Sequence, residues 1–301
     1  MPALIGVDWG GSSLRVYRFG GDGGVAERRA SNHGVATIEG GRFADALGDL
    51  IADWAESGGA RLILCGMVGS RQGWAEADYI ACPTDLSALA ARLLPFDTPF
   101  GPALIAPGLS TDHGGRLDVM RGEETQFLGA LSTPDWSGVI VHPGTHAKWA
   151  TFDGGRITGF RTWMTGELFA LLREQSVLRL LMQDGSHDDA AFDLGVSRGL
   201  ADSAITSLMF SARTEGLFGR IAPTALPSYL SGLLIGSEVA DGLIDVPRSA
   251  RLMLVGDARL MALYRRAFGL AGRADLEIMD GDLAVTRGLW RLARGWMESD
   301  R

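Results

Sequence analysis

A glycine-rich turn follows the first apolar strand and carries residue types suited to binding phosphate. Asp8 ends the apolar run of residues 3–7, where a carboxylate is costly unless it is paired or serves a cation. The turn after it allows close backbone approach and offers two hydroxyls and a cation, from Gly10, Gly11, Ser12, Ser13 and Arg15. This pattern favours an anionic ligand, although an ordinary tight hairpin would also use glycine and serine.

Residues 138–152 repeat the strand–turn–strand plan. The second turn holds Gly144 and Thr145, followed by His146, which could contact phosphate or support the turn. Lys148 is the only lysine among the 28 lysine and arginine residues of the chain. An ammonium meets phosphate oxygens singly, which a planar guanidinium does not reproduce. Two such turns facing each other across a cleft would hold a triphosphate from both sides.

Phosphoryl transfer also needs a carboxylate for Mg²⁺ and a base near the acceptor hydroxyl. No Walker A loop surrounds the single lysine. Glu123 and Glu124 lie together at the start of a predicted helix over residues 123–131. Because adjacent helical residues point about 100° apart, we expect only one of them to face a cleft. Glu124 is our narrow preference as the base and Asp8 is a rival, while a favourable interaction with the helix dipole would also explain both glutamates.

The elements predicted around these residues alternate in type. Each half opens with a glycine-turned β-meander and continues into helices and strands, which indicates an α/β fold with a mainly parallel sheet in each lobe. Helices are predicted at residues 43–54, 85–94, 188–213, 224–243, 257–268 and 282–297, among others. We divide the chain into an N-terminal lobe (1–137), a C-terminal lobe (138–285) and a C-terminal helix (286–301) that packs back on the first lobe.

Composition narrows the function further. The net charge of −8 argues against nucleic-acid binding, and no apolar run reaches the roughly 18 residues that span a bilayer. The start, Met1-Pro2-Ala3-Leu4-Ile5, has no basic region or cleavage site of a secretory signal. Cys65 and Cys82 have no metal-ligand spacing, which is typical of a protein in a reducing cytoplasm.

Several segments together resemble a known family. Residues 8–15, 66–70, 120–126, 143–149, 164–168 and 231–238 occur in the order found in the 2-dehydro-3-deoxygalactonokinases, within the actin/hexokinase/Hsp70-type ATPase superfamily. The resemblance implies a two-lobed, ribonuclease H-like fold with duplicated lobes. It implies ATP-dependent phosphorylation of 2-dehydro-3-deoxygalactonate to the 6-phosphate. One departure is Gly256-Asp257-Ala258, where the superfamily more often has Gly-Gly or Gly-Thr.

The resemblance also implies roles for residues. Asp8 would hold Mg²⁺ through water, Gly10 to Ser13 would contact the β- and γ-phosphates, and Gly256 would lie near the adenosine. A sugar acid needs donors for its carboxylate, and the loop at 66–70 and the helix start at 164–167 could supply them. Thr165 is the expected N-cap there. The substrate candidates are therefore Gly66, Met67, Ser70, Arg161, Met164, Thr165 and Glu167.

Other functions stay open from the sequence alone. Another small-molecule kinase of the superfamily, acting on an amino sugar or pantothenate, would share these motifs. A non-catalytic sugar sensor or an actin-like filament protein is the alternative from a different class. The expected ligands are a small sugar acid and ATP or ADP, with neither nucleic acid nor membrane as a partner, and a homodimer is left open.

Overall fold

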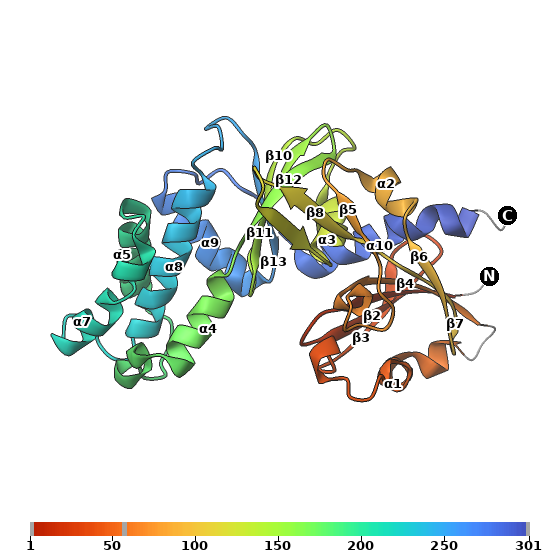
Figure 1. The fold of residues 1–301 in the computed structure, drawn as a ribbon, viewed down its shortest axis with the longest axis horizontal. Helices are drawn as coiled ribbons and strands as arrows, with labels where there is room; N and C mark the ends of the chain where they lie inside the picture. Colours follow the sequence, from red (N-terminus) through yellow and green to blue (C-terminus); the bar gives the residue numbers. More distant parts are fainter. Residues whose placement is uncertain (1–2, 56–58, 299–301) are drawn as a thin grey trace. The chain divides into compact units, whose positions relative to one another are not determined.

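The computed structural model describes residues 3–55 and 59–298. Residues 1–2, 56–58 and 299–301 lie outside the described residues. They include the first two residues of the predicted N-terminal lobe, on which the expectation of no secretory signal partly rests, and the last three residues of the predicted C-terminal helix. The chain forms two compact units, drawn in Figure 1. Unit 1 comprises residues 1–137, 151–160 and 279–301, and unit 2 comprises 138–150 and 161–278. The predicted lobes differ from these units at 151–160 and 279–285, and the lobe division stays a prediction.

The largest sheet has six strands in the order β3-β2-β1-β4-β7-β6. Only the β1–β4 and β4–β7 pairs are parallel, whereas β1–β2, β2–β3 and β6–β7 are antiparallel. The prediction of a mainly parallel sheet is therefore wrong here, because the opening meander and a later hairpin contribute antiparallel pairs. These strands are β1 (Ala3–Trp9), β2 (Leu14–Phe19), β3 (Val25–Ser31), β4 (Ala60–Gly66), β6 (Leu94–Thr98) and β7 (Gly101–Ile105).

A second sheet repeats this strand order. Its strand order, β12-β11-β10-β13-β14, corresponds to β3-β2-β1-β4-β7 of the larger sheet. In both sheets the central pair is parallel, β10 with β13 and β1 with β4. The duplication expected from the two meanders is thus visible in the topology. The strands are β10 (Gly138–His142), β11 (Ala147–Asp153), β12 (Arg156–Trp163), β13 (Leu252–Gly256) and β14 (Glu277–Asp280).

Some predicted elements are shorter or divided. The helix expected over 85–94 is α2 (Leu86–Ala90), because residues 94–98 pair instead as the edge strand β6. The segment 188–213 contains three helices, α5 (Asp189–Ala201), α6 (Ile205–Leu208) and α7 (Ser211–Leu217). Short strands of a third sheet were not predicted, and they are β5 (Tyr79–Ala81), β8 (Gly108–Asp112) and β9 (Leu117–Met120).

Helices cover both faces of the six-stranded sheet. Side chains alternate along a strand, and Val7 on one face of β1 packs in the same cluster as Leu47 of α1 (Phe43–Ala55). On the other face, a Cβ built on Gly6 would lie 3.1 Å from Leu289 of α10 (Gly281–Glu298). Helix α3 (Glu123–Ala130) packs against α10. Sheet and α10 together therefore hold the start of α3, where the two glutamates lie.

Glycines bring α3 and α10 into backbone contact. A Cβ on Gly129 would lie 1.8 Å from the carbonyl oxygen of Ala284, and one on Gly288 would lie 2.0 Å from that of Thr125. Neither carbonyl is a flexible side chain that could move aside. The two helices can therefore keep this distance only with glycine at both positions.

Replacing Gly288 by alanine is expected to lower the free energy of unfolding by about 2–3 kcal/mol, because the added methyl group overpacks the α3–α10 contact. Gly295→Ala on the same helix is the matched control, since a Cβ there meets nothing within 4 Å. Alanine's better helix propensity should leave that variant unchanged or stabilised by up to about 1 kcal/mol. Urea unfolding measures both, and equal stability of the two variants would contradict the packing argument.

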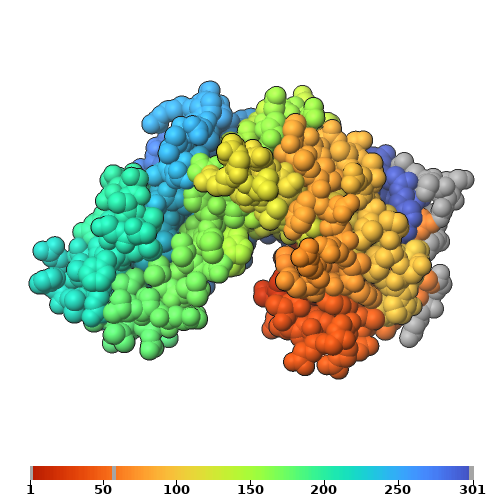
Figure 2. Space-filling model, in the orientation of Figure 1, coloured from red at the N-terminus to blue at the C-terminus, as the bar shows by residue number. Residues whose placement is uncertain are grey.

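Unit 2 contains a layer of helices beside its sheet strands. Helix α8 (Leu226–Gly242) crosses α5 through four glycines, whose Cβ positions would lie 2.2–2.5 Å from carbonyl oxygens of the partner helix: Gly195, Gly199, Gly232 and Gly236. Gly232 and Gly236, which belong to the matching segment 231–238, therefore allow close helix packing within a single unit. Helices α5 to α8 form part of the visible surface of this unit, in teal and light blue in Figure 2. The remaining helices are α4 (Thr165–Gln175) and α9 (Ala258–Leu270).

Candidate phosphotransfer site

The end of β1 brings Asp8 next to a cation and a thiol. Asp8 lies opposite Arg15 in the β1–β2 register and opposite Cys65 in the β1–β4 register. The carboxylate of Asp8 is buried, and its Oδ2 lies 2.6 Å from Nη2 of Arg15. Nη1 of Arg15 lies 2.7 Å from Oδ1 of Asp282 on α10. Arg15 is therefore held between two carboxylates, and the sequence had not indicated Asp282.

Glu124 is a second buried carboxylate in the same unit. It is fully buried, accepts a hydrogen bond from the backbone N–H of Gly122 at 2.6 Å, and accepts another from the Thr125 hydroxyl at 2.9 Å. Burial raises the pKa of Glu124 to about 7, and the charge of Glu123 adds to the shift. Glu123 is only half-buried and accepts from the backbone N–H of Arg121.

Cys65 lies near both of these acids. Burial raises the pKa of its thiol well above the ordinary value, and the charges of Asp8 and Glu124 raise it further. The thiol lies 3.9 Å from Oδ1 of Asp8. The structure therefore gathers two of the three predicted catalytic carboxylates, Asp8 and Glu124, around one buried sulfur. Sequence spacing could not show this, because the residues come from β1, β4 and α3.

In the turn of residues 10–13, which is predicted to bind phosphate, packing within the described protein does not require glycine at position 10 or 11. A Cβ on Gly11 would meet no atom within 4 Å, and one on Gly10 would approach only Ser13, at 3.7 Å. Neither glycine has a positive φ. The turn itself is closed by a bond from the Gly10 N–H to the Ser13 carbonyl, 2.9 Å long. Open space above such a turn is what close approach of a ligand to the backbone requires.

The loop after β4 is folded tightly beside the start of α3. Gly66 has a φ of +93°, and a Cβ there would lie 2.7 Å from the carbonyl oxygen of Trp9. A Cβ on Gly122, whose φ is +109°, would lie 3.1 Å from Cα of Gly66. Met67 begins the single 3₁₀ turn of residues 67–69, and Ser70 follows it with its hydroxyl buried. The predicted substrate loop and the predicted base are thus neighbours in unit 1.

The turn of residues 143–146, also predicted to bind phosphate, is held against α4 in unit 2. His146 pairs with Glu167 at 2.5 Å, and the Glu167 N–H donates to the carbonyl of Thr145 at 3.0 Å. A Cβ on Gly166 would lie 2.5 Å from the carbonyl oxygen of Gly144, so this glycine is needed for the contact. His146 and Glu167, predicted for different ligands, therefore bind each other and fix the turn to the helix.

Lys148 points to a hydroxyl in the interior of unit 2. It is 5% exposed, and its Nζ donates to Oγ1 of Thr162 at 2.9 Å. The lone ammonium is therefore not a freely mobile surface charge. Burial of a lysine is costly unless its donors are satisfied. A buried lysine at this position therefore indicates a specific role for its charge.

Glu238, a buried residue of α8 that is not among the predicted site residues, organises the same region. Glu238 accepts hydrogen bonds from Trp149 at 2.8 Å, from Tyr264 at 2.6 Å and from the hydroxyl of Thr165. Burial raises its pKa to about 7. Thr165 is the first residue of α4, with Met164 at the cap position, so the prediction that Thr165 is the N-cap is wrong. Its hydroxyl serves the buried carboxylate instead.

Arg161 is engaged elsewhere in unit 2. Its Nη2 lies 2.6 Å from Oδ2 of Asp241, and its guanidinium lies 4.6 Å from the ring centre of Trp163. Trp163 donates to the same carboxylate at 3.0 Å. Met164, next along the chain, is exposed. A contact of Arg161 with substrate would compete with this ion pair.

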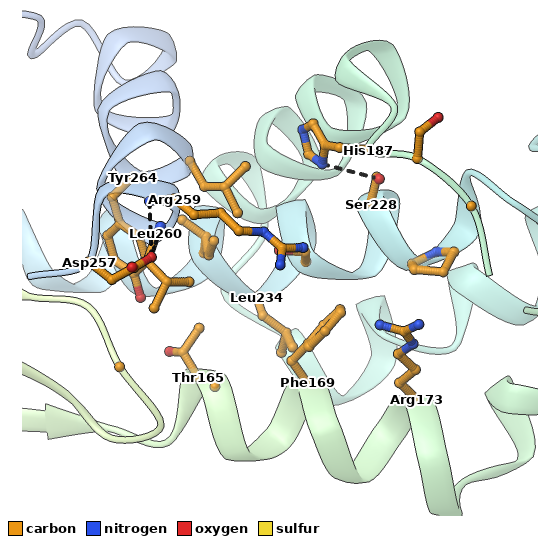
Figure 3. A pocket seen from close by; sticks show the side chains of 18 of the residues that line it. Thr165, Phe169, Arg173, His187, Ser228, Leu234, Asp257, Arg259, Leu260 and Tyr264 are labelled. Carbon is orange, nitrogen blue, oxygen red and sulfur yellow. Dashed lines mark hydrogen bonds between the residues drawn. The ribbon is translucent and has the colours of Figure 1, made fainter. Parts of the chain in front are cut away.

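A cavity of about 420 Å³ opens beside the second turn (Figure 3). Asp257 caps α9 by accepting from the N–H groups of Arg259 and Leu260, and it follows Gly256, whose Cβ position lies 3.7 Å from the Pro143 carbonyl. Phe169 of α4 and Arg259 extend toward one another across the cavity. Gly144, Thr165 and Tyr264 line it as well. Asp257, at the position where the superfamily more often has glycine or threonine, is therefore the N-cap of α9.

Comparison with known proteins identifies the family. The family model described as 2-keto-3-deoxy-galactonokinase matches residues 8–292. The chain belongs to the 2-keto-3-deoxy-galactonokinase family. The curated 2-dehydro-3-deoxygalactonokinase of Escherichia coli is 36% identical over 290 residues, covering 96% of this chain and 97% of the relative. A probable 2-dehydro-3-deoxygalactonokinase of Rhizobium meliloti is 37% identical over 293 residues, covering 96% and 95%.

Solved structures agree with this family assignment. A putative 2-dehydro-3-deoxygalactonokinase from Sinorhizobium meliloti superposes with a TM-score of 0.89 at 36% identity, covering 97% of this chain and 99% of that one. An activator of 2-hydroxyisocaproyl-CoA dehydratase from Clostridium difficile gives a TM-score of 0.52 at 12% identity, covering 99% and 97%, which shows the fold alone. The resemblance and the actin-like α/β fold predicted from the motifs are confirmed.

Membership of a 2-keto-3-deoxy-galactonokinase family makes the chain a phosphotransferase that uses ATP and a small-molecule acceptor. The alternatives of an amino-sugar or pantothenate kinase and of a non-catalytic sensor gain no support from these relatives. Among the described residues, no helix combines the length and apolar character needed to cross a membrane.

Proposed function

We propose that this chain transfers the γ-phosphate of ATP to the terminal hydroxyl of 2-dehydro-3-deoxygalactonate, giving the 6-phosphate. The observation that carries the proposal is the family match over residues 8–292, together with relatives of that name aligned over 96% of the chain. The buried acids at β1 and α3 supply the chemistry. The proposed enzyme works in the cytoplasm, where ATP is available and where the free thiols Cys65 and Cys82 stay reduced.

Glu124 is the proposed general base. A base is most effective when its pKa lies near the working pH, and burial brings the pKa of Glu124 to about 7. The hydrogen bonds from Gly122 and Thr125 fix both of its oxygens. Glu123 is the alternative, because it is one residue away and more exposed.

Asp8 is the proposed Mg²⁺ residue. Mg²⁺ keeps several waters and binds through one or two carboxylates together with substrate phosphates. Within residues 3–55 and 59–298, no group of three or more histidine, cysteine, aspartate or glutamate side chains is placed to hold a metal ion. Asp8 would then orient the ion through water, while the amides of residues 10–13 bind the β- and γ-phosphates and Arg15 neutralises charge. The metal would supply charge neutralisation at the transferred phosphoryl group.

The nucleoside is proposed to lie in the cavity of unit 2. Its lining includes Phe169 and Arg259, and a purine ring between them would gain stacking on one face and a cation–π contact on the other. Gly144, which lines the same cavity, and Thr145, the next residue along the chain, would bind phosphate. His146 and Glu167 support that turn through their ion pair.

An ADP-release assay with ATP and Mg²⁺ across a set of sugar acids and amino sugars tests the function. We expect turnover of 2-dehydro-3-deoxygalactonate well above that of N-acetylglucosamine. Turnover of an amino sugar without turnover of the sugar acid would overturn the proposal. Phosphorus NMR of the product tests the position of transfer, and sedimentation tests the homodimer left open by the sequence.

Replacing Lys148 by methionine is expected to lower kcat about 100-fold, because a buried ammonium close to the second turn would no longer neutralise phosphate charge. Lys148→Arg should not restore the full rate, since a planar guanidinium does not reproduce the geometry of an ammonium beside Thr162. Thr162→Val is the matched control, which removes the hydroxyl that accepts from Lys148. Steady-state kinetics with varied ATP measures all three, and unchanged turnover in Lys148→Met would refute the charge role, whereas unchanged turnover in Lys148→Arg would refute only the need for an ammonium.

A further inference from the structure

Arg121 carries two buried nitrogens without a hydrogen-bond partner among the described residues. The residue is 9% exposed, and it lies directly before the two glutamates of α3. Its Nη2 donates to the carbonyl of Ala77 at 2.7 Å, and the guanidinium lies 4.3 Å from the ring centre of Tyr79. Nε and Nη1 are buried and have no hydrogen-bond partner among the described residues. A buried guanidinium with two unmatched nitrogens is costly, and in native proteins such groups usually have a functional reason.

Ser70 is a second buried group of the same kind. It is 7% exposed, and its hydroxyl likewise has no partner in the described part of the chain. The segments that carry the two groups touch, because a Cβ on Gly69, the residue before Ser70, would lie 3.0 Å from Nη1 of Arg121. The loop after β4 and the start of α3 therefore each carry an unmatched buried group, on neighbouring segments of unit 1.

The loop that carries Ser70 is rigid. The Ser70 N–H donates to the carbonyl of Met67 at 3.0 Å, and the Gly73 N–H donates to the carbonyl of Ser70 at 2.8 Å. A Cβ on Gly73 would lie 2.1 Å from the Val68 carbonyl oxygen. A loop fixed in this way can hold the Ser70 hydroxyl in constant geometry, as selective binding requires.

The chemistry of these groups fits a carboxylate. A guanidinium nitrogen can donate a charge-assisted hydrogen bond to a carboxylate oxygen, and a hydroxyl can donate to the same carboxylate. We propose that Arg121, assisted by Ser70, binds the C1 carboxylate of the sugar acid and so separates acids from neutral sugars. This inference rests on the proposed function. Tyr79 is exposed and lies over the guanidinium, so a shift of its ring gives the substrate access.

One segment would then serve both ends of the substrate. Arg121 would hold the acid end, and Glu124, three residues later and on the other side of Gly122, would face the hydroxyl that accepts phosphate. Gly122 has a φ of +109°, a conformation that side-chain-bearing residues rarely adopt. The turn at this glycine directs the two side chains to different neighbours, Ala77 and Thr125.

Arg121→Gln tests the assignment, with pyruvate as a probe because pyruvate has the same carboxylate and ketone as C1 to C3 of the substrate. We expect KM for 2-dehydro-3-deoxygalactonate to rise about 10- to 100-fold. We expect KM for ATP to stay within about twofold, and inhibition by pyruvate to be lost. A substrate analogue with CH₂OH in place of the carboxylate should be phosphorylated equally by both proteins. Arg71→Gln, which changes an exposed arginine of the same loop, is the matched control.

The outcomes separate this inference from the proposed function. If the wild type does not phosphorylate the sugar acid, the proposed function fails. If it does, and Arg121→Gln keeps the wild-type KM and pyruvate inhibition, only the carboxylate assignment is overturned. Should Arg121→Gln not fold, as judged by circular dichroism, Ser70→Ala decides instead. Several-fold weaker pyruvate inhibition in that variant supports the assignment, and unchanged inhibition overturns it.

Discussion

Replacing Glu124 by glutamine is expected to lower kcat by about 10²- to 10⁴-fold, because the acceptor hydroxyl would lose its general base. Glutamine keeps the size of the side chain and an oxygen that can accept from Gly122 or Thr125, which limits disturbance of α3. KM for ATP should change little. Stopped-flow or coupled ADP-release kinetics measures the effect at saturating substrate.

The control for this prediction is Glu123→Gln, one residue away. We expect it to retain kcat within about tenfold, since its carboxylate is half-buried and accepts from the backbone N–H of Arg121. A collapse of the rate in Glu123→Gln together with near-normal turnover in Glu124→Gln would reverse the assignment. Normal turnover in both variants would leave Asp8 as the remaining candidate for the base.

The pH profile provides an independent check on Glu124. A base must be deprotonated to act, so kcat/KM should fall as the pH drops below about 7, where Glu124 becomes protonated. Its pKa in the folded protein lies above the ordinary value of 4.5, so the neutral form is favoured on folding. The stability that this group contributes is therefore complete below pH 4.5 and is lost as the pH rises through 7. Glu124→Gln should lack this loss in thermal unfolding between those pH values.

Replacing Asp8 by asparagine is expected to lower kcat/KM about 10³-fold, because the Mg²⁺–nucleotide complex would lose its orienting carboxylate. The buried charge of Asp8 is paired with Arg15 at 2.6 Å, so the change also leaves Arg15 with Asp282 as its carboxylate partner. The concentration of Mg²⁺ needed for half-maximal rate should rise. Titration of Mg²⁺ at fixed ATP measures this shift separately from the rate.

Asp282→Asn separates the metal role from the ion-pair role. This variant removes the other carboxylate that binds Arg15, at 2.7 Å, and leaves Asp8 unchanged. We expect a rate within about tenfold of the wild type and no change in Mg²⁺ dependence. Equal losses in the two variants would show that Asp8 acts by holding Arg15 and would exclude it as the metal residue.

Local patterns predicted the elements that open each half of the chain. Apolar strands with glycine turns gave the correct meanders, since β1, β2 and β3 follow one another with short connections. The strands β6, β8 and β9 were missed because strands of four or five residues with mixed polarity have little periodicity. The prediction for α2 extended too far, to residue 94, because residues 94–98 satisfy their backbone hydrogen bonds in the sheet.

The sequence by itself determined the family, the α/β fold and the residue types of the site, because those follow from motifs and from local hydrophobic pattern. Only the tertiary structure decided which side chains meet. It placed Asp8, Cys65 and Glu124 together, paired His146 with Glu167, and gave Thr165 to the buried Glu238. It also left Nε and Nη1 of Arg121 without a hydrogen-bond partner in the described part of the chain, next to Gly69. Such partnerships depend on strand register, on helix contacts through glycine and on burial, which link residues far apart in the chain.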